Sequence, residues 1–402
     1  MRRKGNNRKN DSNVRSVEDD SVSISSSTTI SDFTTDLSVN DLESPARTIL
    51  DEFDQAVDDL SEKKSSVRLK ALRQLLEWIR IRGESVVEIL QGSSSKIDAI
   101  YEALLRFLQK QSSSPEVLGA TRLLSILSFF DCADSSQYFE EYFGELNQLV
   151  TRNENLEIRC AALAAMALCA VHSSCIEEED ILNFTETVLC KQSDGLPVPV
   201  ALQVSALTAW SLLATQAQAS EILRRSRERV FGALAKLLHD PSVDARVAAG
   251  AAMAFIWECA YEVNPDLEGE LDDVTDLICE DQDIGHESLN KLKELVRSSS
   301  KSVSKRDRKE QRGALRTVLD WIVDGEPPSE TVTFYGGAVL ECSGFRQLIL
   351  VEALRSAFAN GFPDAPRLHP RARYARSPTA TLAFCRTSML CYIHILSPFS
   401  IS

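Results

Sequence analysis

A helical pattern that returns at regular intervals constrains the fold of this chain more than any other feature of its sequence. Five segments share an apolar helix period. They read SVRLKALRQLL at 66–76, EVLGATRLLSIL at 116–127, EIRCAALAAMAL at 157–168, VALQVSALTAWSLL at 200–213 and DARVAAGAAMAF at 244–255. Aligned on Arg68, Leu118, Arg159, Leu202 and Arg246, the copies lie 50, 41, 43 and 44 residues apart. This spacing is typical of HEAT and armadillo repeats, which have two or three helices per unit.

Small residues recur at one position of the five segments and allow close helix approach. They are Ala71, Ala120 or Gly119, Ala162, Ser205 and Ala249. Clusters of Ser, Asn, Gly and Pro separate the segments. The sequence therefore predicts an all-α fold, with a HEAT/armadillo-like helical-repeat solenoid over residues 44–300. One irregular all-α bundle is the alternative.

The two ends of the chain have a different composition. Residues 1–43 begin with a basic patch and continue as a Ser/Asp-rich run that holds too little apolar surface to offset the entropy of ordering. We expect a disordered tail there. The basic patch suggests a nuclear-localisation or RNA-contacting segment, or simply a solubilising one. Residues 361–402 are Pro- and Arg-rich and then apolar, and we expect an irregular, disordered tail.

Charge is distributed unevenly along an acidic chain whose net charge is −15. Residues 262–283 carry ten acids and no Lys or Arg, whereas residues 291–316 carry ten cations and three acids. Residues 1–15 carry six cations and one acid. The total charge argues against nucleic-acid binding by the whole surface, but the local basic blocks favour contact with a polyanion at particular places.

One predicted helix combines a basic stripe with an apolar stripe. Ser304 is a suitable N-cap, and Asp307 follows three residues later in a variant of the capping box. Leu315, Val318, Leu319 and Ile322 share one face at helical spacing. The neighbouring face carries cations. The candidate nucleic-acid- or ribosome-binding residues of this helix are Lys305, Arg306, Arg308, Lys309, Arg312 and Arg316.

Two structural interpretations of this basic helix, in which it binds no ligand, also stay open. It is a solvated face beside a core stripe, or it pairs with the acidic stretch 262–283, which we expect to form a helix with an acidic outer face. In the second case a polyanion would have to compete with the acidic stretch.

Motifs that carry chemistry are absent from the sequence. It has no GxGxxG, P-loop, HExxH or GxSxG pattern. The ten cysteines form no CxxC pair, and the five histidines do not cluster. His172 and Cys175 have metal-like spacing but no further ligand nearby. We expect no catalytic, cofactor-binding or metal site, no cofactor, no small-molecule substrate and no enzyme activity. Trp78, Trp210, Trp257 and Trp321 lie on apolar helical stripes and are expected to pack in the core.

The sequence also suggests the cellular compartment of the protein. Residues 1–20 lack the apolar region of a secretory signal, and no apolar run reaches about 18 residues. We therefore expect no membrane contact. Scattered, unpaired cysteines favour a reducing compartment, and we expect the cytoplasm and nucleus.

Residues 304–334, SKRDRKEQRGALRTVLDWIVDGEPPSETVTF, resemble the C-terminal signature of the interferon-related developmental regulator family. Ser304, Lys305, Asp307, Arg308, Gln311 and Arg312 carry the first part of the likeness. Arg316, Val318 and Leu319 carry the second, and Pro328, Glu330, Thr331, Val332 and Phe334 the third. The likeness spans roughly residues 1–355. Residues 301–360 then correspond to the basic helix and part of the family's C-terminal domain. Beyond Gly361 no likeness remains, as an altered reading frame or a splice variant would produce.

This resemblance implies a non-catalytic regulator of gene expression. Members of the family are described as transcriptional co-regulators that bind protein complexes, and also as ribosome-associated translational repressors. The first role implies docking of protein complexes on the solenoid surface. The second implies contact of the ribosome or its RNA with the basic helix 304–316 and the basic N-terminal tail. Both hypotheses remain open at this point.

Overall fold

The computed structural model describes residues 49–81, 94–111, 113–128, 135–172, 178–190, 192–193, 196–265, 271–297, 304–333 and 339–358. The two predicted tails, 1–43 and 361–402, lie outside these ranges, and so does Cys175. The described chain is predominantly helical, which confirms the all-α prediction.

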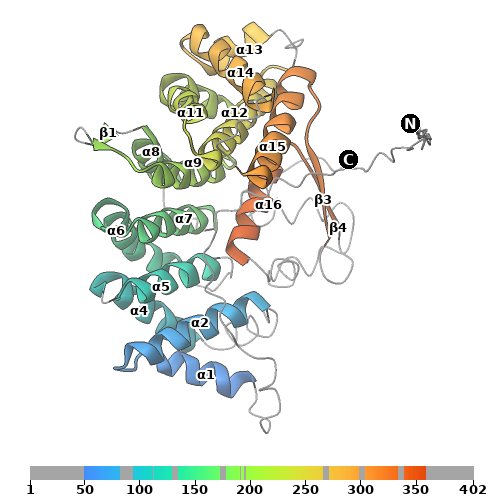
Figure 1. The fold of residues 1–402 in the computed structure, drawn as a ribbon. Coiled ribbons are helices and arrows are strands. Elements are labelled where there is room, and N and C mark those ends of the chain that lie inside the picture. The colour runs from blue at the N-terminus through green and yellow to red at the C-terminus, as the bar shows by residue number, and fades with distance from the viewer. Residues whose placement is uncertain are drawn as a thin grey trace, which may run out of the picture.

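Helices follow one another in pairs along most of the chain (Figure 1). The first helices of the pairs are α1 (Ile49–Asp59), α4 (Ser94–Lys110), α6 (Ser135–Arg152), α8 (Glu178–Cys190), the broken helix α10 (Ala219–Arg225), η2 (Ser226–Val230) and α11 (Phe231–Leu238), and α14 (Gln282–Arg297). The second, inner helices are α2 (Ser65–Ile81), α5 (Ser114–Leu127), α7 (Leu156–His172), α9 (Val200–Ala214), α12 (Val243–Val263) and α15 (Lys305–Asp324).

The inner helices pack on one another in chain order and form one continuous row. Contacts run from α2 to α5, then to α7, α9, α12 and α15 (Figure 1). Each of the five segments predicted from the sequence lies in one of these helices, and α15 adds a sixth. Because each inner helix buries apolar surface against the one before and the one after, the stack is a helical-repeat solenoid.

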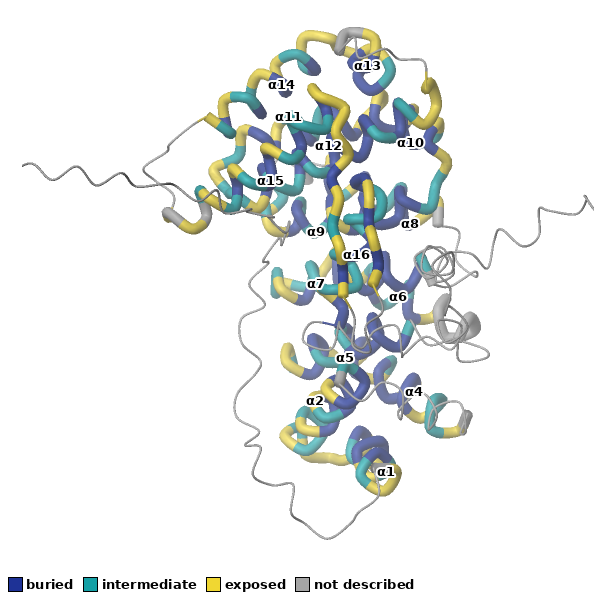
Figure 2. Tube along the Cα trace, turned by 90° about the vertical axis from the view of Figure 1, so that its right-hand side faces the viewer, coloured by how far each residue is buried: buried dark blue, intermediate teal, exposed yellow. Residues whose placement is uncertain are grey.

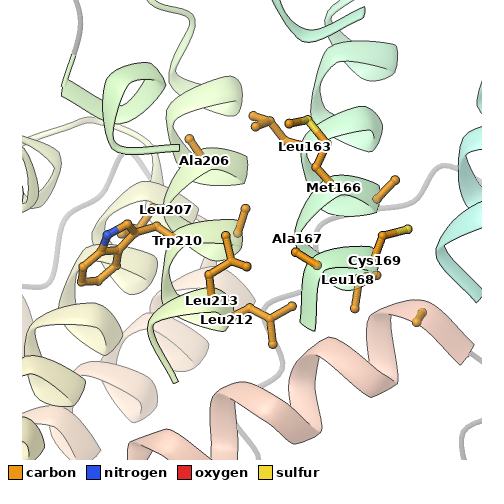
Figure 3. Packing of buried hydrophobic residues seen from close by; sticks show 14 of the residues in the cluster. Leu163, Met166, Ala167, Leu168, Cys169, Ala206, Leu207, Trp210, Leu212 and Leu213 are labelled. Carbon is orange, nitrogen blue, oxygen red and sulfur yellow. The ribbon is translucent and has the colours of Figure 1, made fainter. Parts of the chain in front are cut away.

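The centre of the row shows how the small and large residues interlock. Figure 3 shows α7 and α9 side by side, with Met166 and Leu168 on one helix and Trp210 and Leu213 on the other. Trp210 is completely buried, and its indole Nε1 donates a 3.1 Å hydrogen bond to Glu186 of α8. The other tryptophans also pack in the protein: Trp78 and Trp257 are buried, and Trp321 is half-buried. The expectation that they serve packing is confirmed.

An arginine at the fourth position of three inner helices fixes the turn before each helix. Arg68 of α2 donates to the backbone carbonyls of Glu62 and Lys63, at 2.7 and 2.8 Å. Arg159 of α7 donates to the Val150 carbonyl at 2.7 Å. Arg246 of α12 donates to the carbonyls of Asp240 and Pro241, at 2.6 and 2.9 Å. The repeated arginine therefore satisfies carbonyl groups that the end of the preceding helix or turn leaves unpaired.

Glu116 joins the first two inner helices through a buried ion pair. Its side chain is 1% exposed and lies 2.6 Å from Nη2 of Arg68. Ser65 and Ser113 donate hydrogen bonds to it at 3.0 and 2.8 Å. Desolvation, the largest influence, acts to raise the pKa of this carboxyl, but the hydrogen bonds from Ser113, Ser65 and Arg68 outweigh it and hold the pKa below its usual range.

The acidic stretch does not form the single helix expected from its spacing. Helix α12 ends at Val263, α13 (Leu271–Ile278) is a separate short helix, and α14 begins at Gln282. Asn264 and Pro265 follow the end of α12, and proline cannot continue a helix without losing a hydrogen bond. The prediction of one helix over 262–283 was therefore wrong, although Asp273 and Asp276 of α13 are exposed, as an acidic outer face requires.

Two antiparallel hairpins interrupt the helices and were not predicted. The first pairs β1 (Gln192–Ser193) with β2 (Leu196–Pro197), and the second pairs β3 (Ser329–Thr333) with β4 (Val339–Ser343). In the second hairpin Val332, Leu340 and Cys342 are buried and their neighbours are mostly exposed. The alternation in Thr331-Val332-Thr333 was a strand signal that the sequence did contain.

The last helix, α16 (Phe345–Phe358), lies across the row of inner helices. It packs against α5, α9 and α12, and Figure 3 shows it below the ends of α7 and α9 that carry Leu168 and Leu212. Its first backbone N–H groups, those of Phe345 and Arg346, donate to the Glu258 carboxylate at 2.6 and 3.1 Å. Burial, the largest influence, raises the pKa of Glu258 despite these bonds.

The two ends of α16 are fastened by arginines. Arg346 donates to the Thr215 carbonyl at 2.6 Å and pairs with Glu262 at 2.9 Å. At the other end, Arg80 of α2 donates to the Ala357 carbonyl at 3.2 and 3.1 Å. This helix therefore covers part of the solenoid surface with the chain's own residues.

Among the described helices, none is both long and apolar enough to cross a membrane.

We predict that Glu116→Gln lowers the free energy of unfolding by about 2 kcal/mol at pH 7, because the amide cannot replace a carboxylate that accepts charged and neutral hydrogen bonds. The folded-state pKa of Glu116 is lowered, so its contribution is complete above the ordinary pKa of a glutamate and is lost as the pH falls through the folded-state value. The difference between wild type and variant in urea denaturation should thus shrink in acid.

The matched control for this prediction is Glu157→Gln. Glu157 also pairs with an inner-helix arginine, Arg122, at 3.1 Å, but its side chain is 57% exposed. We expect a change below about 0.5 kcal/mol for this variant. Equal effects of the two substitutions, or a Glu116 effect that does not depend on pH, would contradict the account of the buried pair.

Candidate polyanion-binding helix

Helix α15 begins at Lys305, directly after Ser304, as its sequence predicted. The backbone N–H of Arg308 donates to the Ser304 carbonyl at 3.0 Å, and the Arg308 guanidinium Nε donates to the same carbonyl at 3.3 Å. The side chains of Lys305 and Asp307 lie outside the described residues, so the capping role of Asp307 stays a prediction.

The apolar stripe of α15 packs on α12 and α14. Leu315, Val318 and Ile322 are 0, 2 and 2% exposed, and Leu319 is half-buried. Gly250 of α12 makes the close approach possible, because a Cβ at this position would lie 2.7 Å from Cδ2 of Leu315. The predicted core stripe is confirmed.

Two polar contacts fix the rotation of α15 about its axis. The Gln311 side chain is buried and accepts a 2.7 Å hydrogen bond from Arg246 of α12. Trp321 donates a 3.1 Å hydrogen bond to the Ala254 carbonyl and meets Tyr261 edge to face, with ring centroids 5.8 Å apart. The sequence analysis named Gln311 only as part of the family likeness and did not predict that it faces the core.

The exposed cations of α15 lie on the face that neighbours the apolar stripe. Between Arg306 and Arg316, every exposed side chain that the structure describes is a Lys or Arg: Arg306, Lys309, Arg312 and Arg316. Arg308 is partly buried. Arg306, Arg312 and Arg316 form no salt bridge with any described residue. Figure 2 shows the exposed parts of α15 at the edge of the molecule.

The acidic stretch lies elsewhere in the stack. Helix α13 packs against α10, α12 and α14, while α15 packs against α12 and α14. The open alternative in which the acidic stretch pairs with the basic helix is therefore not met among the described residues. Acids are instead found at the other end of α15 itself. The pKa of Asp320 is raised by partial burial and by Asp324 nearby, with Arg316 acting against this.

The charge order along α15 opposes its own helix dipole. The N-terminus of a helix carries a partial positive charge and favours acids, and the C-terminus favours cations. Helix α15 has Arg306, Arg308 and Lys309 near its start and no basic residue in its last turn, where Asp324 lies. The helix dipole therefore does not favour these cations, and they add to the positive potential at the N-terminal end of α15.

No group of three or more His, Cys, Asp or Glu side chains within the described ranges is arranged to hold a metal ion.

The fold and this helix together define a class: a HEAT/armadillo-like helical-repeat protein whose last inner helix displays a cationic face. A sequence model of the interferon-related developmental regulator (IFRD) family matches residues 20–323, from before α1 into the last turn of α15. The chain belongs to this family.

Relatives in several organisms support the assignment. An uncharacterised protein of Schizosaccharomyces pombe is 25% identical over 333 residues, which are 79% of this chain and 72% of that protein. Interferon-related developmental regulator 2 of Mus musculus is 26% identical over 328 residues, 76% of this chain and 67% of that protein. Interferon-related developmental regulator 1 of Rattus norvegicus is 30% identical over 155 residues, 38% of this chain but only 31% of that protein. Membership supports a regulator-like role.

We predict that Arg306→Glu raises the free energy of unfolding by about 0.5 kcal/mol at low ionic strength, because it replaces a cation in the first turn of α15 by an acid. In 1 M salt the effect should disappear, since screening shortens the range of exposed charges to about 3 Å. Urea denaturation at both salt concentrations measures it.

Arg297→Glu is the control for the dipole effect. Arg297 is exposed in the last turn of α14, where a cation is favourable, so the same change of charge should lower the free energy of unfolding. A loss of stability in both variants would show that Arg306 stabilises α15 by contacts rather than opposing its dipole.

Proposed function

We propose that this chain is a non-catalytic regulator of gene expression that associates with the ribosome and dampens translation, with α15 as its contact to RNA. The observation that carries the proposal is the exposed cationic face between Arg306 and Arg316, against which the described part of the acidic stretch does not pack. A cation that contacts a phosphate releases condensed counterions, and this favours binding of RNA at physiological salt.

The position of α15 in the stack supports this role. A terminal repeat needs a polar outer face for solubility, but mixed charges would meet that need. On this face the exposed side chains that the structure describes are all cations, and Arg306 lies in the first turn, where the helix dipole disfavours a positive charge. An anionic partner explains this arrangement better than solubility does. The candidate contact residues are Lys305, Arg306, Arg308, Lys309, Arg312 and Arg316.

A second candidate function is transcriptional co-regulation through binding of protein complexes. The observation that favours it is the continuous stack of helix pairs, since solenoids present long surfaces to protein partners. Helix α16 already lies across part of the inner row, so a protein partner would use the remaining surface or displace this helix.

The experiment that tests the ribosomal role is sedimentation of the full chain with polysomes. We predict that replacing four exposed cations of α15 by Gln abolishes co-sedimentation. The substituted residues are Arg306, Lys309, Arg312 and Arg316. In a binding assay with ribosomal RNA, the slope of log affinity against log salt should become shallower by about 3, because nearly one counterion is released per phosphate contact.

A charge-matched control uses four exposed lysines near the other end of the solenoid. They are Lys63, Lys64, Lys70 and Lys110. Replacement of these by Gln changes the net charge equally and should leave co-sedimentation intact. If both quadruple variants still sediment with ribosomes, α15 is not the contact. If the wild-type chain itself does not sediment with ribosomes, the ribosomal role is excluded and transcriptional co-regulation becomes the favoured function.

A further inference from the structure

The hairpin of β3 and β4 has an open edge. The backbone N–H of Gly344 donates to the Pro328 carbonyl at 2.8 Å, so this pair is a hydrogen-bonded pair of the antiparallel ladder. Hydrogen-bonded and non-hydrogen-bonded pairs alternate along such a ladder. The register therefore turns the backbone groups of Ser329, Thr331 and Thr333 away from β4. We call the N–H and C=O groups of these three residues the open edge of β3.

No element that the structure describes pairs with this open edge. β4 is the described element that packs closely along β3, and Ser329, Thr331 and Thr333 form no hydrogen bond with any other. Their side chains are exposed. The outer edge of β4 is partly used, because the Ser343 N–H donates to Oε1 of Gln347 in α16 at 2.8 Å. Figure 1 shows the hairpin at the side of the stack, next to α15 and α16.

The open edge lacks most of the features that prevent the addition of a strand. Edge strands are commonly protected by Lys, by Pro within the strand, by a bulge or by a covering element. β3 has the sequence SETVT, with no Lys, no Pro and a regular register over its five residues. Thr and Val also favour extended backbone. The open edge can therefore accept a third strand, as in β-augmentation.

Two acids that share one arginine lie on the inward face of β3. Glu330 is on the same face as the buried Val332, and its carboxylate accepts a 3.1 Å hydrogen bond from Arg355 of α16. Arg355 also lies 3.7 Å from Glu352, whose Oε2 is buried and has no hydrogen-bond partner. Burial, the largest influence, raises the pKa of Glu352, although Arg355 acts against this. The two carboxylates thus leave a negative charge that one guanidinium does not balance.

The surrounding sequence is acidic as well. Residues 317–345 carry five acids and no Lys or Arg. Opposite charges on facing residues of neighbouring strands stabilise their pairing, and like charges destabilise it. A third strand is therefore favoured when it places a cation opposite Glu330.

A second copy of β3 suits the open edge less well. If Thr331 paired with its own copy, every outward backbone group would find a partner. The two Glu330 side chains would then lie diagonally across the same face, about 7–8 Å apart between their backbones. This repulsion favours a partner of the opposite charge over self-association.

We propose that the open edge of β3 binds an extended, basic segment of a partner protein as an antiparallel third strand. The segment carries Lys or Arg opposite Glu330 and an apolar, β-branched residue opposite Val332. These two positions are non-hydrogen-bonded pairs, in which facing side chains approach most closely. The site goes beyond the proposed function, because it shares no residue with α15 and does not depend on contact with RNA.

Fluorescence anisotropy of the full chain with a labelled peptide tests the site. The probe contains the core Thr-Val-Thr-Lys-Thr, which in antiparallel pairing places its Val opposite Val332 and its Lys opposite Glu330. We expect saturable binding. A peptide with Glu in place of Lys should bind at least about tenfold more weakly, because like charges then face each other.

Two N-methylated peptides separate strand pairing from charge attraction. An N-methyl group on the central Thr removes the N–H that donates to the Thr331 carbonyl, and it should weaken binding at least about tenfold. The N–H of the peptide's Lys points away from β3 in the same pairing. An N-methyl group there leaves the charge unchanged and should keep the affinity within about threefold.

Two proline variants of the chain test the same edge. Thr331→Pro removes an outward N–H that β4 does not use, and proline is tolerated at such edge positions. The variant should bind the probe at least about tenfold more weakly. Glu341→Pro is the matched control, because Glu341 faces Thr331 and its N–H lies on the outer edge of β4. It should still bind the probe. Circular dichroism and urea denaturation check both folds, and the N-methylated peptides decide alone if a variant does not fold.

Absence of saturable binding to the wild-type chain overturns the proposal. So does binding that does not depend on the position of the N-methyl group, or that persists in folded Thr331→Pro. Analytical ultracentrifugation tests the remaining occupant. A wild-type dimer that Thr331→Pro converts to a monomer would assign the open edge to a second copy and would also overturn the proposal. None of these outcomes depends on whether α15 binds RNA.

Discussion

Burial of each inner helix between its two neighbours is the constraint on which the rest of the structure depends. Helix α9 illustrates it, because Trp210 and Leu213 are both buried and yet point in different directions (Figure 3). A single helix pair has no core of its own to bury such a surface. Stacking provides one, and the small residues of the inner helices set the distance at which neighbours pack.

The properties of α15 follow from its place at the end of that row. An inner helix in the middle of the stack has an inner neighbour on each side, whereas α15 has α12 on one side and no further inner helix among the described residues. Its apolar stripe packs on α12 and α14, and the neighbouring face, which carries the cations, is exposed. Because α15 lies at the end of the row, its outer surface must be polar. This surface can therefore carry several cations close together. The buried Gln311–Arg246 hydrogen bond and the Trp321–Ala254 hydrogen bond determine which face that is.

Helix α16 shows a second consequence of the stack. Helix α16 packs against α5, α9 and α12, so the row of inner helices provides a surface on which another helix lies. Its position is set at both ends by groups that belong to the solenoid: the Glu258 carboxylate at its N-terminus and the Arg80 guanidinium at its C-terminus. Gly344 has a φ of +85°, a left-handed conformation that favours glycine, and a Cβ there would lie 2.6 Å from Oε1 of Glu258. The solenoid surface is therefore partly used by the chain itself.

The sequence by itself determined the repeated helices, their spacing, the small residues between them and the two stripes of α15, because helical periodicity decides which side chains share a face. The tertiary structure alone decided which faces are covered. Helix α13 of the acidic stretch packs on α10 and α12, and Glu258 caps a helix that begins 87 residues later. Both features depend on contacts between parts of the chain that are distant in sequence. Local sequence patterns do not predict such contacts. An apolar stripe indicates that one face of a helix will be buried, but not which surface of the protein will cover it.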